Sequence, residues 1–178
     1  MRHLKTHYHP DIKSLEGRSI FTRLATRSIA LHHDELLLLY TERYDDFSLP
    51  GGGLEPHEDQ VEGLIRELRE ETGAQGIRNI MPFGVYEEYR PWYKPDYELQ
   101  RIISYCYTCE VDHALGASQL ESYEQANGMR ALWVNLYEAI AHNERTMASS
   151  LKKGMSIERE TYLLRLIADE LLNSPTRK

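Results

Sequence analysis

The sequence predicts an α/β/α sandwich built around a mixed β-sheet. Three observations predict this class. Residues 36–40 form a continuous apolar run, which is typical of a strand buried on both faces. A helix with one apolar stripe ends at Gly73, and a second helix pattern follows Ser156 near the end of the chain. With strands on both sides of the first helix, the last helix is expected to cover the second face of the sheet.

Length and composition predict one domain. The chain has 178 residues, of which 41% are hydrophobic and 28% charged, as in ordinary globular proteins. Residues 1–17 are polar and are expected to form a mobile N-terminal segment, which leaves 18–178 as the domain. The longest apolar run is strand-sized, so no membrane span is expected. The N-terminus lacks the apolar centre of a signal peptide, so a cytoplasmic location is predicted.

The net charge of -7 argues against a nucleic-acid partner, because such proteins carry broad basic surfaces. It leaves room for a small anionic substrate, since a bound metal ion can reverse the sign of a site. A P-loop phosphate site is excluded, because the glycines at 51–53 are not followed by Gly-Lys-Ser/Thr.

The predicted elements follow from local patterns along the chain. Residues 99–111 give the clearest strand, and 77–89 are expected to pair antiparallel with it across an aromatic loop. The other predicted elements are strands at 25–32, 36–40 and 130–136, a polar loop at 112–128, and helices beginning at Tyr137 and Ser156.

Cys106 and Cys109 allow two interpretations. A C-x-x-C pair can serve a redox or zinc site. These two lie in the predicted strand 99–111, however, where residues three apart point to opposite faces. No second Cys or His pair is evident to complete a zinc site, which favours two buried thiols.

The central helix carries an unusual concentration of charge. Its apolar stripe is Val61, Leu64, Ile65 and Leu68. Glu67, Glu70 and Glu71 share another face, because residues three and four apart are neighbours on a helix. Such a face is either a solvated surface or a site for a hard divalent cation with oxygen ligands.

The stretch 49–74 resembles the Nudix box, the signature of a family of pyrophosphohydrolases. The fixed positions of that box are matched by Gly52, Glu58, Arg66, Glu67, Leu68, Glu70, Glu71, Gly73 and Ala74. The resemblance implies a Nudix-type sandwich with a C-terminal helix and a Mg²⁺ or Mn²⁺ cofactor. It also implies a small-molecule substrate in which a nucleoside diphosphate is linked to another group. ADP-ribose, dinucleoside polyphosphates, nucleotide sugars and nucleoside triphosphates all remain open.

The resemblance also implies roles for individual residues. Glu67, Glu70 and Glu71 match the metal ligands, and Glu58 matches the glutamate that supports them. Arg66 matches the box arginine, which is expected to orient a neighbouring glutamate through a charge-assisted hydrogen bond. Gly51 and Gly52 are expected to let substrate or metal approach the backbone closely. The general base is either a box glutamate or a carboxylate outside the box, where the first candidate is Glu124 and the others are Glu121, Asp112 and Glu87.

A cluster of aromatic residues follows the helix, at Tyr86, Tyr89, Trp92, Tyr93 and Tyr97. Tyr89 and Trp92 are predicted to stack on a nucleobase of the substrate. The other interpretation is that the cluster packs at the edge of the core or in the contact of a homodimer. A further alternative for the whole protein is a sensor with this fold that binds a nucleotide without cleaving it, but the box is intact.

Overall fold

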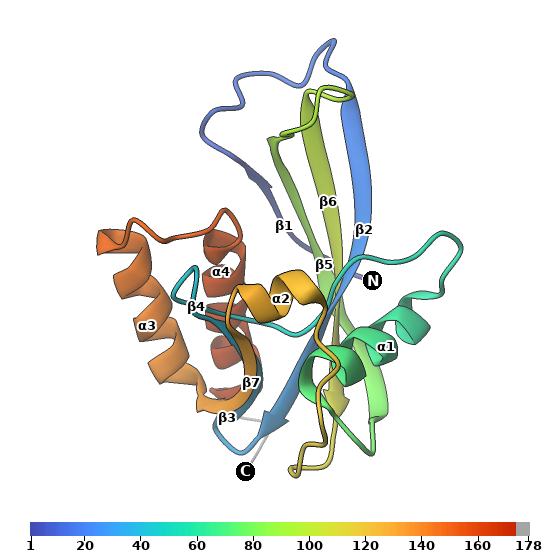
Figure 1. The fold of residues 1–178 in the computed structure, drawn as a ribbon, viewed down its shortest axis with the longest axis vertical. Helices are drawn as coiled ribbons and strands as arrows, with labels where there is room; N and C mark the ends of the chain where they lie inside the picture. The colour runs from blue at the N-terminus through green and yellow to red at the C-terminus, as the bar shows by residue number, and fades with distance from the viewer. Residues whose placement is uncertain (174–178) are drawn as a thin grey trace.

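A seven-stranded mixed sheet with helices on both sides forms the fold (Figure 1), in a computed structural model that describes residues 1–173. Its strands are β1 (His3–Tyr8), β2 (Ile20–His32), β3 (Glu35–Thr41), β4 (Asp46–Ser48), β5 (Arg78–Pro91), β6 (Leu99–Glu110) and β7 (Met129–Asn135). Its helices are α1 (Gln60–Thr72), α2 (Ser122–Ala126), α3 (Leu136–Ser149) and α4 (Ile157–Ile167), which continues into the π-helical turn η1 (Ala168–Leu172).

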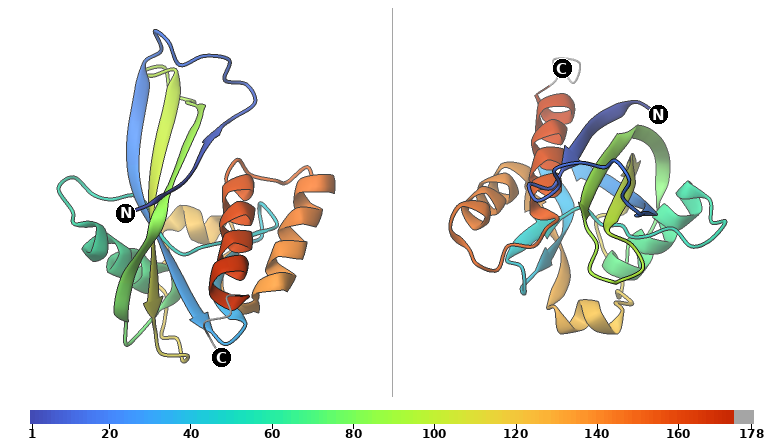
Figure 2. Two further views of the ribbon diagram at one scale, coloured as in Figure 1. Left: turned by 180° about the vertical axis from the view of Figure 1, so that it is seen from behind. Right: turned by 90° about the horizontal axis from the view of Figure 1, so that it is seen from above.

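The strand order is β1-β5-β6-β2-β3-β4, and β7 pairs with the other side of β3. The pairs β1–β5 and β2–β6 are parallel and the remaining pairs are antiparallel, which confirms the mixed sheet. β5 and β6 form the predicted antiparallel pair. Figure 2 shows α1 on one side of the long strands and α3 with α4 on the other, so the predicted three layers are present.

Two apolar clusters hold the layers together. Leu36 and Leu38 point into the cluster beneath α3 and α4, whereas Leu37 points into the cluster beneath α1. All three side chains are fully buried. Alternation along β3 therefore buries the run on both faces, as its unbroken apolar pattern predicted. Burial of each such side chain stabilises the fold by about 1.5–3 kcal/mol.

Helix α1 ends at the predicted Gly73 and has a cap at each end. Asp59 caps it, and the Asp59 carboxylate accepts hydrogen bonds from the backbone N–H of Val61 at 2.8 Å and of Glu62 at 3.3 Å. Gly73 ends the helix in the left-handed conformation, with a φ of 68°. The caps and the buried Leu68 fix where each glutamate of the helix lies.

The N-terminal segment differs from the prediction, because residues that were expected to be mobile include strand β1. β1 pairs with β5, and Leu4 packs on the core against Gly84, where a Cβ atom would come within 2.3 Å of Leu4 Cδ2. The Tyr8 ring stacks on Tyr89 with centroids 5.2 Å apart. This strand is recognisable only once its partner strand is in place, since its own sequence is polar.

The two cysteines lie in different cores, as the strand geometry predicted. Cys106 belongs to the cluster beneath α3 and α4, and Cys109 to the cluster beneath α1. Both thiols are free and buried, and burial raises the pKa of each to about 12. This arrangement supports structural thiols.

Helices α3 and α4 pack against each other and cover one face of the sheet. Asn135 caps α3 by accepting hydrogen bonds from the backbone N–H groups of Tyr137 and Glu138. Ser156 is the N-cap residue of α4, as predicted, although its side chain makes no capping hydrogen bond. None of the helices within residues 1–173 combines the length and apolar character needed to cross a membrane.

Candidate active site

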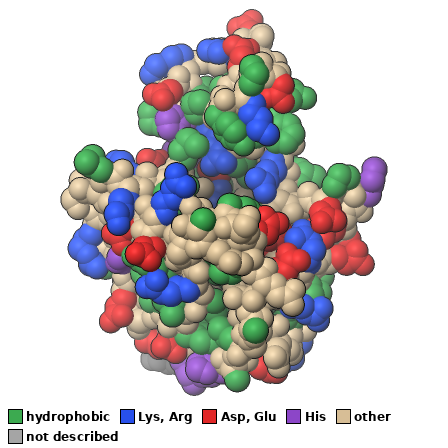
Figure 3. Space-filling view, in the orientation of Figure 1, with side chains coloured by type: hydrophobic (Ala, Val, Ile, Leu, Met, Phe, Trp, Pro, Cys, Tyr) green, Lys and Arg blue, Asp and Glu red, His purple; other side chains and the backbone are tan. Residues whose placement is uncertain are grey.

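A cavity of about 600 Å³ opens where the glycine turn, α1, α2 and one face of the sheet meet. Figure 3 shows a hollow below the upper lobe of the molecule, with basic side chains gathered around it. The charged groups that line the cavity include carboxylates of Glu55, Glu67, Glu70, Glu71, Glu121 and Glu124 and guanidinium groups of Arg23, Arg27, Arg66, Arg90 and Arg159. The box residues therefore face a space large enough for a small ligand.

Arg66 holds the box glutamates in place. Its Nε and Nη2 donate to the two carboxylate oxygens of Glu58 at 2.7 and 2.9 Å. Its Nη1 donates to Glu67 at 2.8 Å and to Glu70 at 3.2 Å. The hydrogen bonds from Arg66 lower the pKa of Glu58 to about 2. The hydrogen bond predicted between Arg66 and a neighbouring glutamate is present, and the arginine bridges three of them.

Glu71 is the most buried carboxylate of the box, with 5% of its surface exposed. One of its oxygens accepts a hydrogen bond from the backbone N–H of Gly51 at 2.6 Å. Among residues 1–173 it takes part in no ion pair. Burial raises its pKa well above the usual range, and the charges of Glu67 and Glu124 raise it further. An ionised Glu71 therefore needs a cation.

The glycine turn has no room for side chains. A Cβ atom on Gly52 would lie 2.5 Å from Oε2 of Glu67, and one on Gly51 would lie 2.1 Å from the carbonyl oxygen of Thr26. Gly51 also has a φ of 140°, which other residues rarely adopt. The carbonyl of Gly52 accepts a hydrogen bond from the backbone N–H of Thr26 in β2 at 3.0 Å, so the turn is fixed against the sheet.

The donors gathered here fit a hard divalent cation. Glu67 and Glu71 are largely buried and face the cavity beside the glycine backbone, and Glu70 lies closer to solvent. All three offer carboxylate oxygens, which are the ligands that Mg²⁺ and Mn²⁺ prefer. Burial raises the pKa of Glu67 as well as that of Glu71, and a bound cation would remove that cost.

Some candidates for the general base line the cavity and others do not. Glu124 and Glu121 line the cavity, where the predicted loop contains the short helix α2. Glu124 is 5% exposed, and its carboxylate accepts hydrogen bonds from the Glu121 backbone N–H at 2.7 Å and from the Tyr123 hydroxyl at 3.1 Å. Asp112 and Glu87 lie outside the cavity lining and bind Arg78 and Arg101 instead.

The structure does not bring Tyr89 and Trp92 to the cavity. Tyr89 neighbours the cavity residue Arg90 on β5, and adjacent strand residues face opposite sides of the sheet. The Trp92 ring packs 5.1 Å from that of Phe21, and its Nε1 donates to Asp96 at 2.9 Å. This placement gives no support to base stacking and is compatible with the alternative in which the aromatic cluster packs at the edge of the core.

Four arginines at the cavity were missed by the sequence analysis, namely Arg23, Arg27, Arg90 and Arg159. Arg23, Ala25 and Arg27 alternate along β2 and share the cavity face. That alternation was a usable signal, but the strand was predicted to begin at residue 25. Arg90 on β5 and Arg159 on α4 had no such local signal. Burial lowers the pKa of Arg27 and of Arg90, although both remain cations.

Comparison with known proteins agrees with this geometry. The profile described as NUDIX domain matches residues 22–154. A protein named cleavage and polyadenylation specificity factor subunit 5, from Dictyostelium discoideum, is 26% identical over 152 residues, which cover 79% of this chain and 75% of that protein. Diphosphoinositol polyphosphate phosphohydrolase 3-alpha from Mus musculus is 41% identical over 56 residues, 31% of this chain. That match spans about a third of the relative, 34% of its length.

Solved structures share the fold. A NUDIX hydrolase from Nitrosomonas europaea superposes with a TM-score of 0.54 at 19% identity, over 80% of this chain and 90% of that one. A MutT protein from Bacillus halodurans gives a TM-score of 0.50 at 22% identity, over 67% and 72% of the two chains. The fold and the matched profile therefore define the class as a NUDIX-domain protein. The chain belongs to the NUDIX family.

Proposed function

We propose that the protein is a Mg²⁺- or Mn²⁺-dependent pyrophosphohydrolase that cleaves the diphosphate linkage of a nucleoside diphosphate joined to another group. One observation carries the proposal. The carboxylates of Glu67, Glu70 and Glu71 line the same cavity as the guanidinium groups of Arg23, Arg27 and Arg90. Carboxylates that bind cations, next to arginines that bind phosphate, suit a diphosphate with bound metal.

Glu67, Glu70 and Glu71 would hold the cation. A bound divalent ion supplies charge neutralisation on the phosphate oxygens and a lower pKa for water at neutral pH. The protein's own part is to fix these carboxylates. Arg66, itself held by Glu58, does so for Glu67 and Glu70, and the Gly51 N–H does so for Glu71. Their position is set before substrate arrives, so little reorganisation is needed during the reaction.

Arg23, Arg27 and Arg90 would bind the phosphate groups. They belong to β2 and β5, the two strands that flank β6 in the sheet. Arginine presents planar N–H groups that match phosphate oxygens, and it stays charged even when buried. These contacts would orient the scissile linkage between the arginines and α1, which contributes to the rate by positioning.

Glu124 is proposed as the general base. It lines the same cavity, and the hydrogen bonds from the Glu121 N–H and the Tyr123 hydroxyl orient its carboxylate. A carboxylate held at the wall of the cavity can accept a proton from an attacking water. A Glu124→Gln variant is expected to lose turnover while its metal affinity stays close to that of the wild type.

The comparisons add one class of compound to the candidate substrates. The relatives that match about a third of the chain are named diphosphoinositol polyphosphate phosphohydrolases, so a diphosphoinositol polyphosphate joins the nucleotide candidates. The several arginines of the cavity are compatible with a substrate rich in phosphate. A sensor without catalysis remains the alternative, but the complete carboxylate set favours cleavage. A cytoplasmic location, a homodimer and the lack of a nucleic-acid partner rest on the sequence alone.

The proposal is tested by measuring phosphate release over this panel with Mg²⁺, Mn²⁺ or a chelator. Glu67→Gln is expected to lower turnover by about 10²-fold or more, because the neutral side chain binds the cation weakly. Glu62→Gln is the matched control, since Glu62 lies exposed on the same helix outside the cavity. Activity in chelator, or wild-type turnover in Glu67→Gln, would contradict the proposal.

A further inference from the structure

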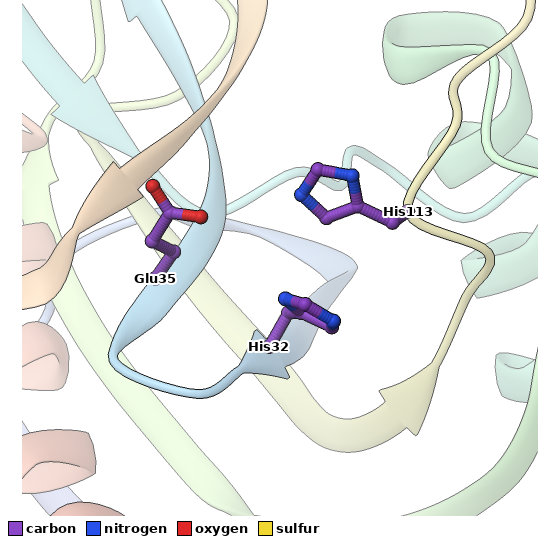
Figure 4. A group of neighbouring side chains, drawn as sticks. All are labelled: His32, Glu35 and His113. Carbon is purple, nitrogen blue, oxygen red and sulfur yellow. The ribbon is translucent and has the colours of Figure 1, made fainter.

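Two histidines and a glutamate meet outside the catalytic cavity. His32, Glu35 and His113 each offer one ligand atom, and these atoms all lie within 4.8 Å of one another. Figure 4 shows the three side chains converging from the β2–β3 hairpin and from the segment that follows β6. None of the three lines the catalytic cavity. The cluster is therefore a separate feature of the molecule.

The hairpin fixes two of the three groups. His32 ends β2 and Glu35 begins β3, and the two residues are directly paired across the turn. Residues that face each other across antiparallel strands present their side chains on the same side. His33 in the turn has a φ of 59°, the left-handed conformation that a two-residue hairpin uses. Local geometry alone therefore places the imidazole beside the carboxylate.

The third group is held by a tryptophan. The His113 ring stacks on Trp133 with centroids 5.2 Å apart and an interplanar angle of 10°. The Trp133 Nε1 also donates to the carbonyl oxygen of His113 at 3.0 Å. Trp133 lies on β7 opposite Leu37, two residues along β3 from Glu35. The tryptophan thus fixes both the backbone and the ring of His113 next to the hairpin.

We propose that His32, Glu35 and His113 form a binding site for a transition-metal ion of the Zn²⁺ class. Two imidazole nitrogens and one carboxylate suit Zn²⁺, whereas Mg²⁺ prefers oxygen ligands alone. Ligand atoms around a tetrahedral ion with bonds of about 2.0–2.1 Å lie about 3.3 Å apart. Rotation of the His32 and Glu35 side chains toward His113 would close the present spacing to that value. Three protein ligands leave a fourth position for water.

A cation at this site would join two distant parts of the chain. It would link the β2–β3 hairpin to the segment that carries His113 and continues into α2 with Glu124. Because the ion binds only the folded arrangement, it is expected to raise the melting temperature.

Calorimetric titration with Zn²⁺ in a large excess of Mg²⁺ tests the site, because Mg²⁺ competes for carboxylate-only sites. One equivalent is expected to bind the wild type, and His113→Gln is expected to weaken it by about tenfold or more. Co²⁺ is expected to give a visible absorption spectrum that the variant lacks. His33→Asn is the matched control, because it removes a neighbouring histidine and asparagine tolerates a positive φ.

Two further measurements keep the result unambiguous. Melting without added metal is expected to show that His113→Gln is folded. The double variant Glu67→Gln/Glu71→Gln is expected to retain the Zn²⁺ equivalent, so failure of the proposed catalytic metal site does not affect this one. Equal Zn²⁺ affinity in the wild type and His113→Gln, or no binding in the wild type, would overturn the proposal.

Discussion

Two arginines in this molecule each bridge several glutamates, but one group belongs to the proposed metal site and the other to a buried ion-pair network. Arg66 binds Glu58, Glu67 and Glu70 at the edge of the cavity, where the Arg66 side chain is 27% exposed. Arg159 also belongs to the cavity lining, but it is buried together with its partners Glu88 and Glu160, and no member of that network is more than 4% exposed. The first group has one guanidinium for three carboxylates, whereas the second has one for two.

The difference follows from what each network must do. In the interior an unpaired charge is very costly, so Glu160 also accepts a hydrogen bond from the Leu49 backbone N–H at 2.9 Å. Around Arg66 the larger surplus of negative charge persists because solvent and a cation can reach these more exposed carboxylates. Unbalanced carboxylates that are held rigidly thus distinguish a metal site from an internal ion pair, even though both contain the same residue types.

The largest expected effect comes from a substitution at the cavity that changes activity and stability in opposite directions. Glu71→Gln is expected to lower turnover by about 10²–10³-fold, since it removes a metal ligand. The same change is expected to raise the melting temperature in chelator, because it removes a buried charge that has no ion pair. Calorimetry with and without Mn²⁺ measures the melting temperatures of the wild type and the variant. The rise in melting temperature that Mn²⁺ gives the wild type is expected to be absent in the variant. A less stable variant in chelator would break the comparison.

The interior network should respond in the opposite way. Arg159→Ala leaves Glu88 and Glu160 buried without their partner and is expected to cost about 3–5 kcal/mol of unfolding free energy. Arg165→Ala is the matched control on the same helix. Its ion pair with Glu144 is exposed, so its loss should cost no more than about 1 kcal/mol. Denaturant unfolding measures the free energy of unfolding of both variants. Equal losses would show that burial does not determine how much each ion pair contributes to stability.

Asp46 sharpens the comparison further, because this buried carboxylate forms no ion pair among residues 1–173. Burial, with the nearby charge of Glu160, raises its pKa from 3.8 to about 7. The folded state therefore binds this proton more tightly, and stability falls as pH rises between those values. Asp46→Asn is expected to raise the melting temperature by at least about 2 °C near pH 8 and to change little near pH 4. A pH-independent shift would contradict the assignment.

The smallest effect is expected outside the cavity. Tyr89→Ala should leave KM within about twofold of the wild type, because Tyr89 faces the side of the sheet away from the cavity. Tyr123→Ala is expected to raise KM several-fold, since Tyr123 lines the cavity and donates a hydrogen bond to Glu124. An effect of this size corresponds to the free energy of about one stacking contact. Steady-state kinetics on the best substrate compares them, and a higher KM for Tyr89→Ala would restore the base-stacking prediction.

The box helix could be predicted from the sequence because its information is local. The apolar stripe and the Gly73 terminus act within a few residues, so the mutual placement of Glu67, Glu70 and Glu71 was fixed by helical spacing. The buried run in β3 and the opposite faces of Cys106 and Cys109 likewise followed from strand alternation. Each of these patterns can be followed within one element.

What the sequence could not decide is which distant elements meet. The polar strand β1 depends on β5 for its existence, and Tyr89 was placed at the site because alternation alone does not say which face of β5 looks into the cavity. His113 lies far along the chain from the hairpin that carries His32. The sequence by itself determined the carboxylate helix and its glycine turn, through contacts between near neighbours. Tertiary structure decided the arginines opposite them and the histidine cluster, because strand pairing and packing bring those residues together from separate parts of the chain.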